Sequence, residues 1–387
     1  MKIKSVSAKA ILDSRKEKTI QVSIKTNIGN FKASSPSGKS KGKYEAKPYK
    51  KNLLGDIGTL KKLSEYFSQE TIETFEDLRR IEDIVTGHVG ANSVIALEYA
   101  VLKAMAKEQK KQIWQIINPK LSSKGSFPRL VGNCIGGGKH VLISKKPDFQ
   151  EFLLIPDTKT IKEAFETNKK IKYMVEQDLK EADKGFKSKE NSENAWITCL
   201  NEKEVLEILK TYKIPLGLDV AASSFYKRGK HYYENPMLKR DVDEQLAYLE
   251  NLIRNFNIFY IEDAFNEEDF DSFSKLLKKF PDRLIVGDDL IVTNHKRLEK
   301  AIEKKSINAI IVKPNQCGSL LEVARVVELA RKHKLKIVFA HRSGETEENI
   351  LADLAFGFQA DFLKCGIDGK ERKAKLRRLM EIEKNLR

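Results

Sequence analysis

Residues 258–265 read IFYIEDAF, residues 284–290 read LIVGDDL and residues 309–314 read AIIVKP, and these stretches carry the pattern that decides the fold. Each is an apolar run with a residue able to do chemistry at or near its end. The same pattern recurs in three more places, at residues 215–222, 336–343 and 361–366. In chain order the six chemical residues are Asp219, Glu262, Asp288, Lys313, His341 and Lys364.

These six residues follow one another at intervals of 43, 26, 25, 28 and 23 positions. All intervals but the first match the length of one strand plus one helix. Strands that alternate with helices form parallel sheets, and in a barrel of such units the C-terminal ends of all strands meet on one rim. The pattern therefore predicts an α/β barrel whose chemical residues converge on that rim.

The residue types at these strand ends indicate a chemistry. The three carboxylates Asp219, Glu262 and Asp288 come first, and two lysines follow with a histidine and Arg342 among them. A cluster of unpaired carboxylates is electrostatically costly without a cation, and hard cations such as Mg²⁺ prefer oxygen ligands. The sequence suggests a divalent cation beside an anionic substrate, with lysine available as a base.

Length and charge limit the classes of protein that fit. A chain of 387 residues suits one barrel of about 250 residues and a smaller domain. Lysine and arginine exceed the acidic residues by 16 (71 against 55). These basic residues are spread through predicted helices such as 296–305 and 370–387 and are not interleaved with aromatic residues. We therefore expect no nucleic-acid partner, and a lysine-rich surface that attracts a small anionic metabolite.

Cysteine usage and the absence of long apolar runs predict the compartment. The four cysteines are scattered and contain no Cys-x-x-Cys pair, which is typical of a reduced, cytoplasmic protein. Residues 1–14 have no continuous apolar core for a signal peptide. No run approaches the ~18 apolar residues of a membrane span, so we expect no membrane partner.

A change of pattern near residues 122–126, SSKGS, divides the chain into an N-terminal α+β domain, 1–124, and a barrel domain, 125–387. The first domain is predicted to contain strands at 3–11, 19–25 and 30–34 and helices at 59–67, 74–85 and 91–107. The barrel is predicted to begin with strands at 130–134 and 151–156 and helices at 161–179 and 202–211. The polar stretch 185–200 is expected to be an exposed loop.

Several strings closely resemble enolase sequences, and they stand in the same order along the chain. They read GLDVAAS at 217–223, YIED at 260–263, VGDDLIVTN at 286–294, VKPNQ at 312–316 and HRSGETE at 341–347. The first half adds ILDSR at 11–15, PSG at 36–38, GGKH at 137–140 and QEF at 150–152. The resemblance implies an enolase-type TIM barrel, a (β/α)8 barrel with irregular first units, capped by the N-terminal α+β domain.

The resemblance also implies a reaction. In this family it is the reversible dehydration of 2-phosphoglycerate to phosphoenolpyruvate, a hydro-lyase step of glycolysis and gluconeogenesis. Enolase-superfamily sites combine a lysine or histidine base with one or two Mg²⁺ ions, and the resemblance implies two here. It further implies a homodimer or higher homo-oligomer.

Residue roles follow from the matching strings. The metal ligands are expected to be Asp219, Glu262, Asp288 and Ser40. The catalytic residues are expected to be Lys313, the base, with Glu193, Glu151, His140 and His341. Substrate contacts are expected from His140, Glu151, Arg342, Ser343 and Lys364. Neighbouring cations such as Lys364 are expected to lower the pKa of Lys313 so that it can act as a base.

The chain departs from the family in the segment of its general acid. That glutamate stands in a Gly-Asp-Glu-Gly-Gly string in the family, whereas residues 192–196 read SENAW and keep only Glu193. The loop at 38–42, GKSKG, is unusually rich in lysine. Two other readings therefore stay open, namely an enolase-like scaffold or binding protein with lost or altered catalysis, and a metal-dependent lyase for another phosphorylated or carboxylated acid.

Overall fold

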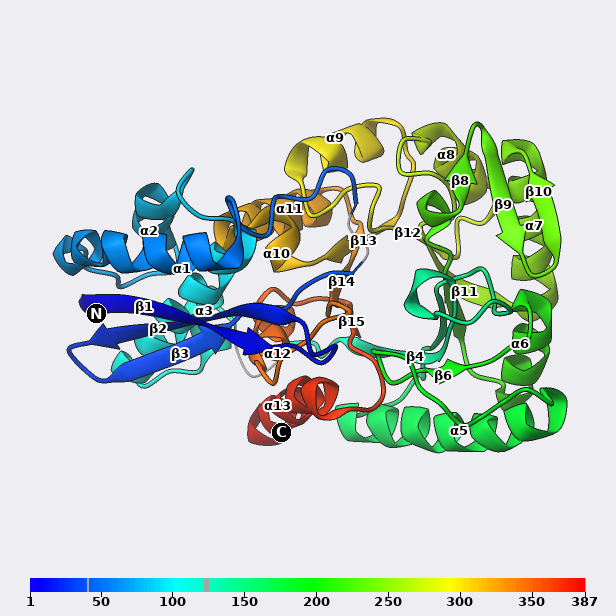
Figure 1. Cartoon of the computed structure of the whole chain (residues 1–387), viewed down its shortest axis with the longest axis horizontal. Coiled ribbons are helices and arrows are strands. Elements are labelled where there is room, and N and C mark those ends of the chain that lie inside the picture. Colours follow the sequence, from blue (N-terminus) through cyan, green and yellow to red (C-terminus); the bar gives the residue numbers. More distant parts are fainter. Residues whose placement is uncertain (40–41, 122–124, 387) are drawn as a thin grey trace.

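The computed structural model describes residues 1–39, 42–121 and 125–386, which form a small antiparallel sheet with its helices and, beside it, a closed barrel (Figure 1). The boundary predicted between residues 124 and 125 stays a prediction, because residues 122–124 lie outside the described residues. No helix among the described residues is both long enough and apolar enough to cross a membrane.

The N-terminal sheet is the predicted meander of three antiparallel strands. Its strands are β1 (Ile3–Leu12), β2 (Lys18–Thr26) and β3 (Asn30–Ser34). Ile20, Val22 and Ile24 alternate along β2 and are buried, as expected of a strand with one face on a core. The helices of this part are α1 (Leu53–Lys62), η1 (Leu63–Gln69), α2 (Leu78–Val85), α3 (Ala91–Glu108) and α4 (Ile113–Ile117).

The helix predicted at 59–67 was wrong in its bounds. It begins earlier, at Leu53, because the Asn52 side chain accepts a hydrogen bond of 2.8 Å from the Gly55 amide and caps the first turn. Beyond Lys62 the chain continues as the 3₁₀ helix η1. The asparagine cap was the signal that the sequence reading overlooked.

Eight strands close the barrel, which confirms the predicted fold class. They are β4 (Arg129–Gly136), β5 (Glu151–Leu154), β7 (Leu216–Asp219), β11 (Ile258–Glu262), β12 (Leu284–Gly287), β13 (Ala309–Val312), β14 (Lys336–Ala340) and β15 (Phe362–Lys364). They pair in this order, and β15 pairs back with β4. Apolar side chains such as Val131, Tyr260 and Val338 form a separate buried cluster contributed by the barrel strands.

The first units are irregular, as predicted. Strand β5 runs antiparallel to both of its neighbours, because β4 returns to it without an intervening α-helix, through a segment that contains the short η2 (Gly138–His140). The register then aligns three carboxylates across adjacent strands. Glu151 of β5 pairs with Asp219 of β7, and Asp219 pairs with Glu262 of β11.

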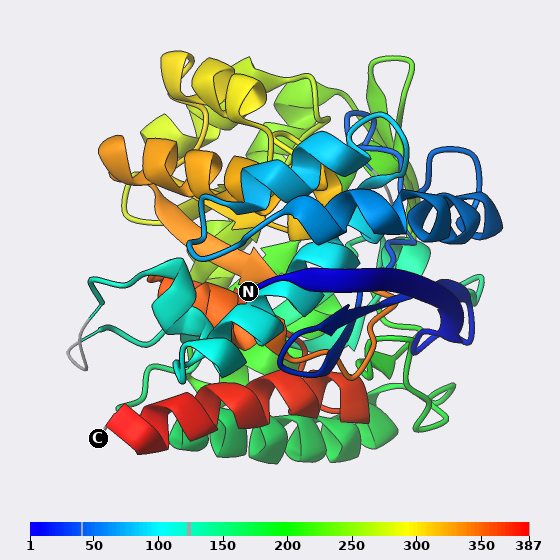
Figure 2. The same ribbon diagram turned by 90° about the vertical axis from the view of Figure 1, so that its left-hand side faces the viewer.

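Helices surround the barrel, and α13 lies beside α5 along one side of the molecule (Figures 1 and 2). Their bounds are α5 (Ile161–Ala182), α6 (Glu202–Leu209), η3 (Lys210–Tyr212), η4 (Ala222–Ser224), α7 (Val242–Phe256), α8 (Phe270–Lys279), α9 (His295–Glu303), α10 (Pro314–Cys317), α11 (Leu320–Lys332), α12 (Ile350–Gly357) and α13 (Lys370–Leu386). The remaining strands are β6 (Trp196–Ile197), beside β4, and the three-stranded sheet β8 (Tyr226–Lys227), β9 (Lys230–Glu234) and β10 (Met237–Arg240).

The expectation of an exposed loop over residues 185–200 was wrong for its central part. Asn191, Glu193 and Ala195 are buried, and β6 attaches the segment to β4. The prediction failed because it assumed that polar side chains face solvent, whereas Asn191 and Glu193 form hydrogen bonds within the protein.

Phe356 joins the two parts of the chain and offers a test of their packing. Its ring is fully buried on α12, stacks on Phe127 at 4.6 Å between ring centroids and meets Trp114 of α4 edge-on at 5.1 Å. We predict that Phe356→Ala lowers the free energy of unfolding by about 3–5 kcal/mol in urea denaturation, because it removes transfer energy and leaves a cavity. Leu142→Ala, at a side chain 88% exposed, serves as the control and should stay within about 0.5 kcal/mol of the parent.

Candidate active site

A cavity of about 240 Å³ opens at the rim where the parallel strands end. Most of the predicted site residues line it, and they are His140, Glu151, Glu193, Asp219, Asp288, Lys313, His341, Arg342, Ser343 and Lys364. Glu262 is fully buried and contacts Lys364, one of these lining residues. Ser40 lies outside the described residues. The described residues chosen from the sequence are therefore brought together.

Lys364 contacts all three carboxylates of the aligned row. Its Nζ lies 2.9 Å from Glu151 Oε2, 3.0 Å from Asp219 Oδ2 and 2.7 Å from Glu262 Oε2, with all four side chains buried. Burial favours loss of the lysine proton, but the three carboxylates outweigh burial and hold the pKa of Lys364 well above its ordinary value. Lys364 is therefore a fixed positive charge at the base of the cavity.

Lys313 stands directly after β13 and forms an ion pair through Nζ with Asp288 Oδ2. Burial lowers the pKa of Lys313, whereas Asp288 raises it by more, so that the pKa lies above its ordinary value. The expectation of a lowered pKa was therefore wrong. The physical reason is that the nearest charged group is a carboxylate, not another cation.

Arg342 follows β14, and its guanidinium is held by side chains from two other segments of the chain. Its Nη2 donates to Glu45 Oε2 at 2.9 Å and to Glu45 Oε1 at 3.1 Å, and its Nη1 donates to Asn315 Oδ1 at 2.8 Å. Beside it, Ser343 Oγ accepts from the Lys39 amide at 2.8 Å. A guanidinium held in this way presents the planar donor set that matches carboxylate or phosphate oxygens.

Gln316 links the Lys313 and Arg342 regions. Its Nε2 donates to Asp288 Oδ1 at 2.9 Å and to Glu45 Oε1 at 3.3 Å, while its Oε1 accepts from Thr293 Oγ1 at 2.8 Å. Thr293 Oγ1 also accepts from the Lys313 amide at 2.9 Å. One buried amide thus orients Asp288 and Glu45 together.

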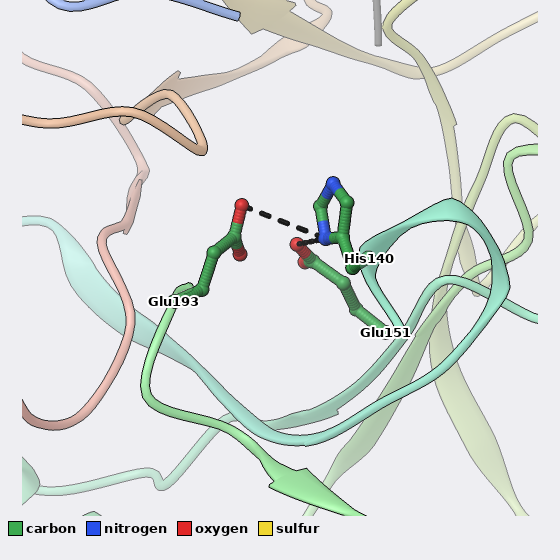
Figure 3. Close-up of side chains that lie close together, drawn as sticks. All are labelled: His140, Glu151 and Glu193. Carbon is green, nitrogen blue, oxygen red and sulfur yellow. Dashed lines mark ion pairs between the residues drawn. The ribbon is translucent and has the colours of Figure 1, made fainter. Parts of the chain in front are cut away.

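On another side of the cavity, His140, Glu151 and Glu193 point toward one another (Figure 3). His140 Nδ1 lies 3.7 Å from Glu151 Oε1 and 3.6 Å from Glu193 Oε1. Glu193 Oε2 lies 3.6 Å from His341 Nε2 and accepts from Asn133 Nδ2 at 3.2 Å. Burial lowers the pKa of His140 to about 4 and raises the pKa of Glu151 to about 7. Near neutral pH this corner therefore holds an uncharged histidine beside a carboxyl that can carry a proton.

Sequence reasoning missed the contacts that Glu45, Asn133 and Gln316 make. Glu45 is the only acidic residue in the stretch 38–45, which was a usable signal in a lysine-rich loop. Gln316 belongs to the VKPNQ string but had no role assigned to it. Asn133 stands within an apolar strand and gave no signal, because a single buried amide is common in a core.

The residues fit a hard cation, although not in one compact group. Among the described residues, two groups have ligand atoms within 4.8 Å of one another, His140 with Glu151 and Glu193, and Asp263 with Asp288 and Asp289. Asp219 and Glu262 instead converge on the Lys364 Nζ. Glu262 Oε1 is buried without a hydrogen-bond partner among the described residues, as expected of an oxygen that a cation could take. The carboxylate oxygens of Asp219, Glu262 and Asp288 are of the kind that Mg²⁺ prefers.

Comparisons with known proteins agree over the whole chain. The family model described as "Enolase, C-terminal TIM barrel domain" matches residues 125–387, and "Enolase, N-terminal domain" matches residues 3–117. A protein named Enolase from Methanosphaera stadtmanae is 35% identical over 99% of this chain and 97% of its own length. Those from Natronomonas pharaonis and Pyrobaculum aerophilum are 34% and 33% identical over 99% and 95% of this chain, and over 99% and 91% of their own lengths.

These matches confirm the resemblance seen in the separate strings, because they join those strings into one continuous similarity that includes both parts of the fold. The chain belongs to the enolase family.

Proposed function

We propose that this protein catalyses the Mg²⁺-dependent, reversible dehydration of 2-phosphoglycerate to phosphoenolpyruvate, a step of glycolysis and gluconeogenesis. It is a lyase of the enolase family, a phosphopyruvate hydratase, and none of the comparisons favours the scaffold reading. The observation that carries the proposal is that Lys313 and Glu193 open into one cavity lined by fixed cations. Lys313 follows β13, and the Glu193 segment lies beside β4. Strands β14 and β15 stand between β13 and β4 in the closed barrel, so the two residues come from separate places on the rim.

The reaction needs a base and an acid on different sides of the substrate. Lys313 is protonated while it pairs with Asp288, so it would first have to lose its proton, which becomes easier once Asp288 turns to a cation. Its Nζ would then take the proton from the carbon next to the carboxylate, and Glu193 would give a proton to the hydroxyl, which leaves as water. The substrate thereby loses one proton and one hydroxyl, together one water, as the carbon–carbon double bond forms. His140 and Glu151 would hold Glu193 and the hydroxyl side of the substrate, and His341 lies against the same carboxyl.

Binding of the substrate would use the fixed cations. Arg342 and Ser343 would hold the phosphate, which would replace the Glu45 carboxylate on the guanidinium. Lys364 would face the substrate carboxylate. Asp219, Glu262 and Asp288 would hold one Mg²⁺ and Ser40 would contribute to a second. The bound ions would stabilise the negative charge that develops when the carbon loses its proton.

The cytoplasmic location and the homodimer or higher homo-oligomer are also part of this proposal. The first rests on the scattered cysteines, and the second rests on the family resemblance. The substrate class is a small phosphorylated acid. Other phosphorylated or carboxylated acids serve as comparison substrates, and a higher kcat/KM with one of them would favour the related-lyase reading.

The first prediction concerns the metal. Phosphoenolpyruvate formation, followed by absorbance, should require Mg²⁺ and stop in excess chelator. Asp288→Asn should lower the rate ~10²-fold or more, because it removes one anionic oxygen ligand, with little change in the melting temperature by circular dichroism. Asp282→Asn, at a carboxylate 71% exposed, is the matched control and should behave as the parent. Full activity in excess chelator would refute the metal requirement.

The second prediction concerns the base. Lys313→Ala should abolish exchange of the carbon-bound proton of the substrate with solvent, measured by NMR in D₂O. Substrate binding, measured by calorimetry, should stay detectable, because Arg342 and Ser343 bind the phosphate independently. Lys162→Ala, at a lysine side chain 73% exposed on α5, controls for loss of a positive charge. Exchange at the parental rate in Lys313→Ala would show that another group is the base.

The third prediction concerns the acid. Glu193→Gln should still exchange the carbon-bound proton, because Lys313 is untouched, yet form product ~10²- to 10⁴-fold more slowly, which is the usual contribution of a general acid. Both rates are measured on one preparation. Product at the normal rate would place the acid elsewhere, and Glu151 and His140 would be tested next.

A further inference from the structure

A tight turn presents Glu193 to the cavity, and both of its ends are tied down. Glu190 and Trp196 form an antiparallel bridge across the turn. Beyond it, Trp196 and Ile197 pair with Ile135 and Gly136 of β4, and the Trp196 indole Nε1 donates to the Lys172 carbonyl of α5 at 2.9 Å. Between these anchors the course of the chain depends on residues 191–195 and on one side-chain contact, in which Asn194 Nδ2 donates to Glu190 Oε2 at 3.0 Å.

Asn191 provides the hydrogen bonds that shape this turn. Its Oδ1 accepts from the Glu193 amide at 2.9 Å and from the Ala195 amide at 3.1 Å. The backbone N–H of Asn191 donates to the Ala195 carbonyl at 2.9 Å, and the backbone carbonyl of Asn191 accepts from the Asn194 N–H at 3.0 Å. A side-chain oxygen that accepts from backbone amides two and four residues ahead fixes a loop as a cap fixes a helix end.

The two ends of the Asn191 amide group differ in their surroundings. Asn191 Nδ2 is buried and has no hydrogen-bond partner among the described residues. It lies against Gly136, where an added Cβ would come within 2.2 Å of it. The side-chain oxygen therefore makes the hydrogen bonds to the turn, whereas the nitrogen only packs against β4.

Rigid elements hold the partners of the Glu193 carboxyl, so the turn decides whether the carboxyl reaches them. Asn133 belongs to β4, His140 to η2, and His341 follows β14. Within the turn, Asn194 has a φ of 59°, a left-handed conformation that asparagine tolerates better than most residues. The turn thus keeps its shape in a chain that has no glycine between residues 191 and 195.

We propose that Asn191 is the positioning residue that holds the Glu193 carboxyl where it can protonate the leaving hydroxyl. The inference rests on the proposed function, because it concerns only the dehydration half of that reaction. Without the Oδ1 acceptor, the amides of Glu193 and Ala195 lose their partner and the turn loosens. Lys313 and the carboxylate row belong to the other strands and keep their places.

The experiment separates the two halves of the reaction on one preparation of each full-length variant. Proton exchange into the substrate in D₂O reports on Lys313, and phosphoenolpyruvate formation reports on Glu193 as well. Asn191→Ala should keep exchange within ~3-fold of the parent and slow product formation ~10²-fold, since a misplacement of about 1 Å has that cost. The substrate KM should change less than kcat.

Two matched variants show whether the oxygen is responsible. Asn191→Asp keeps the acceptor oxygen and replaces the unpartnered nitrogen with a second oxygen, which adds a negative charge to the turn. It should recover part of the product rate, because the two backbone amides regain their partner. Ser192→Ala lies in the same turn, where the hydroxyl makes no hydrogen bond to any residue that the structure describes, and it should match the parent. A partly unfolded sample would lower exchange and product together and leave their ratio unchanged.

The outcomes distinguish this inference from the proposed function. If Asn191→Ala forms product at the parental rate, or loses exchange and product equally while folded, Asn191 does not position the acid. If Asn191→Ala does not fold, Asn191→Ser, which retains a shorter acceptor, is scored by the same ratio. If the parent protein exchanges the proton and forms product but both Asn191→Asp and Asn191→Ser fail as Asn191→Ala does, the oxygen is not the cause. A parent that neither exchanges nor dehydrates the substrate would refute the proposed function itself.

Discussion

The structure depends on how a row of buried carboxylates is neutralised. The strand register sets Glu151, Asp219 and Glu262 side by side, and Lys364 Nζ contacts all three. Carboxylates this close would repel one another strongly in a medium of low dielectric constant, so the row needs a cation or bound protons on the same spot. The barrel supplies that charge from its last strand, β15, which closes the ring against β4.

The same principle extends around the rim, where each cation is matched by an acid from a different segment. Lys313 pairs with Asp288, and Arg342 pairs with Glu45. Gln316 connects the last two acids, so the arrangement forms a continuous network instead of isolated pairs. Such a site is already oriented before a substrate anion arrives, and an incoming phosphate or carboxylate competes with an internal acid for each cation.

The sequence could reveal those parts of the site that belong to regular units. Asp219, Glu262, Asp288, Lys313 and Lys364 end or follow apolar runs, which are evenly spaced from Glu262 onward, and the barrel follows from the same periodicity. Residues 185–200 could not be read in this way, because polarity alone does not say whether polar groups meet water or each other. The raised pKa of Lys313 also lay beyond the sequence, since it depends on which of several charges is nearest.

Strand β5 has a further consequence because it runs against its neighbours. Gly136 at the end of β4 pairs with Glu151 at the start of β5, so the 14 residues 137–150 leave and re-enter the barrel at one point of the rim. The segment is an Ω-shaped excursion with a closed neck. Loop-closure entropy grows slowly, at about 0.6 kcal/mol for each doubling of length. Changes of length are therefore cheap only within the exposed stretch 142–145, because His140 lines the cavity and Phe149 is fully buried.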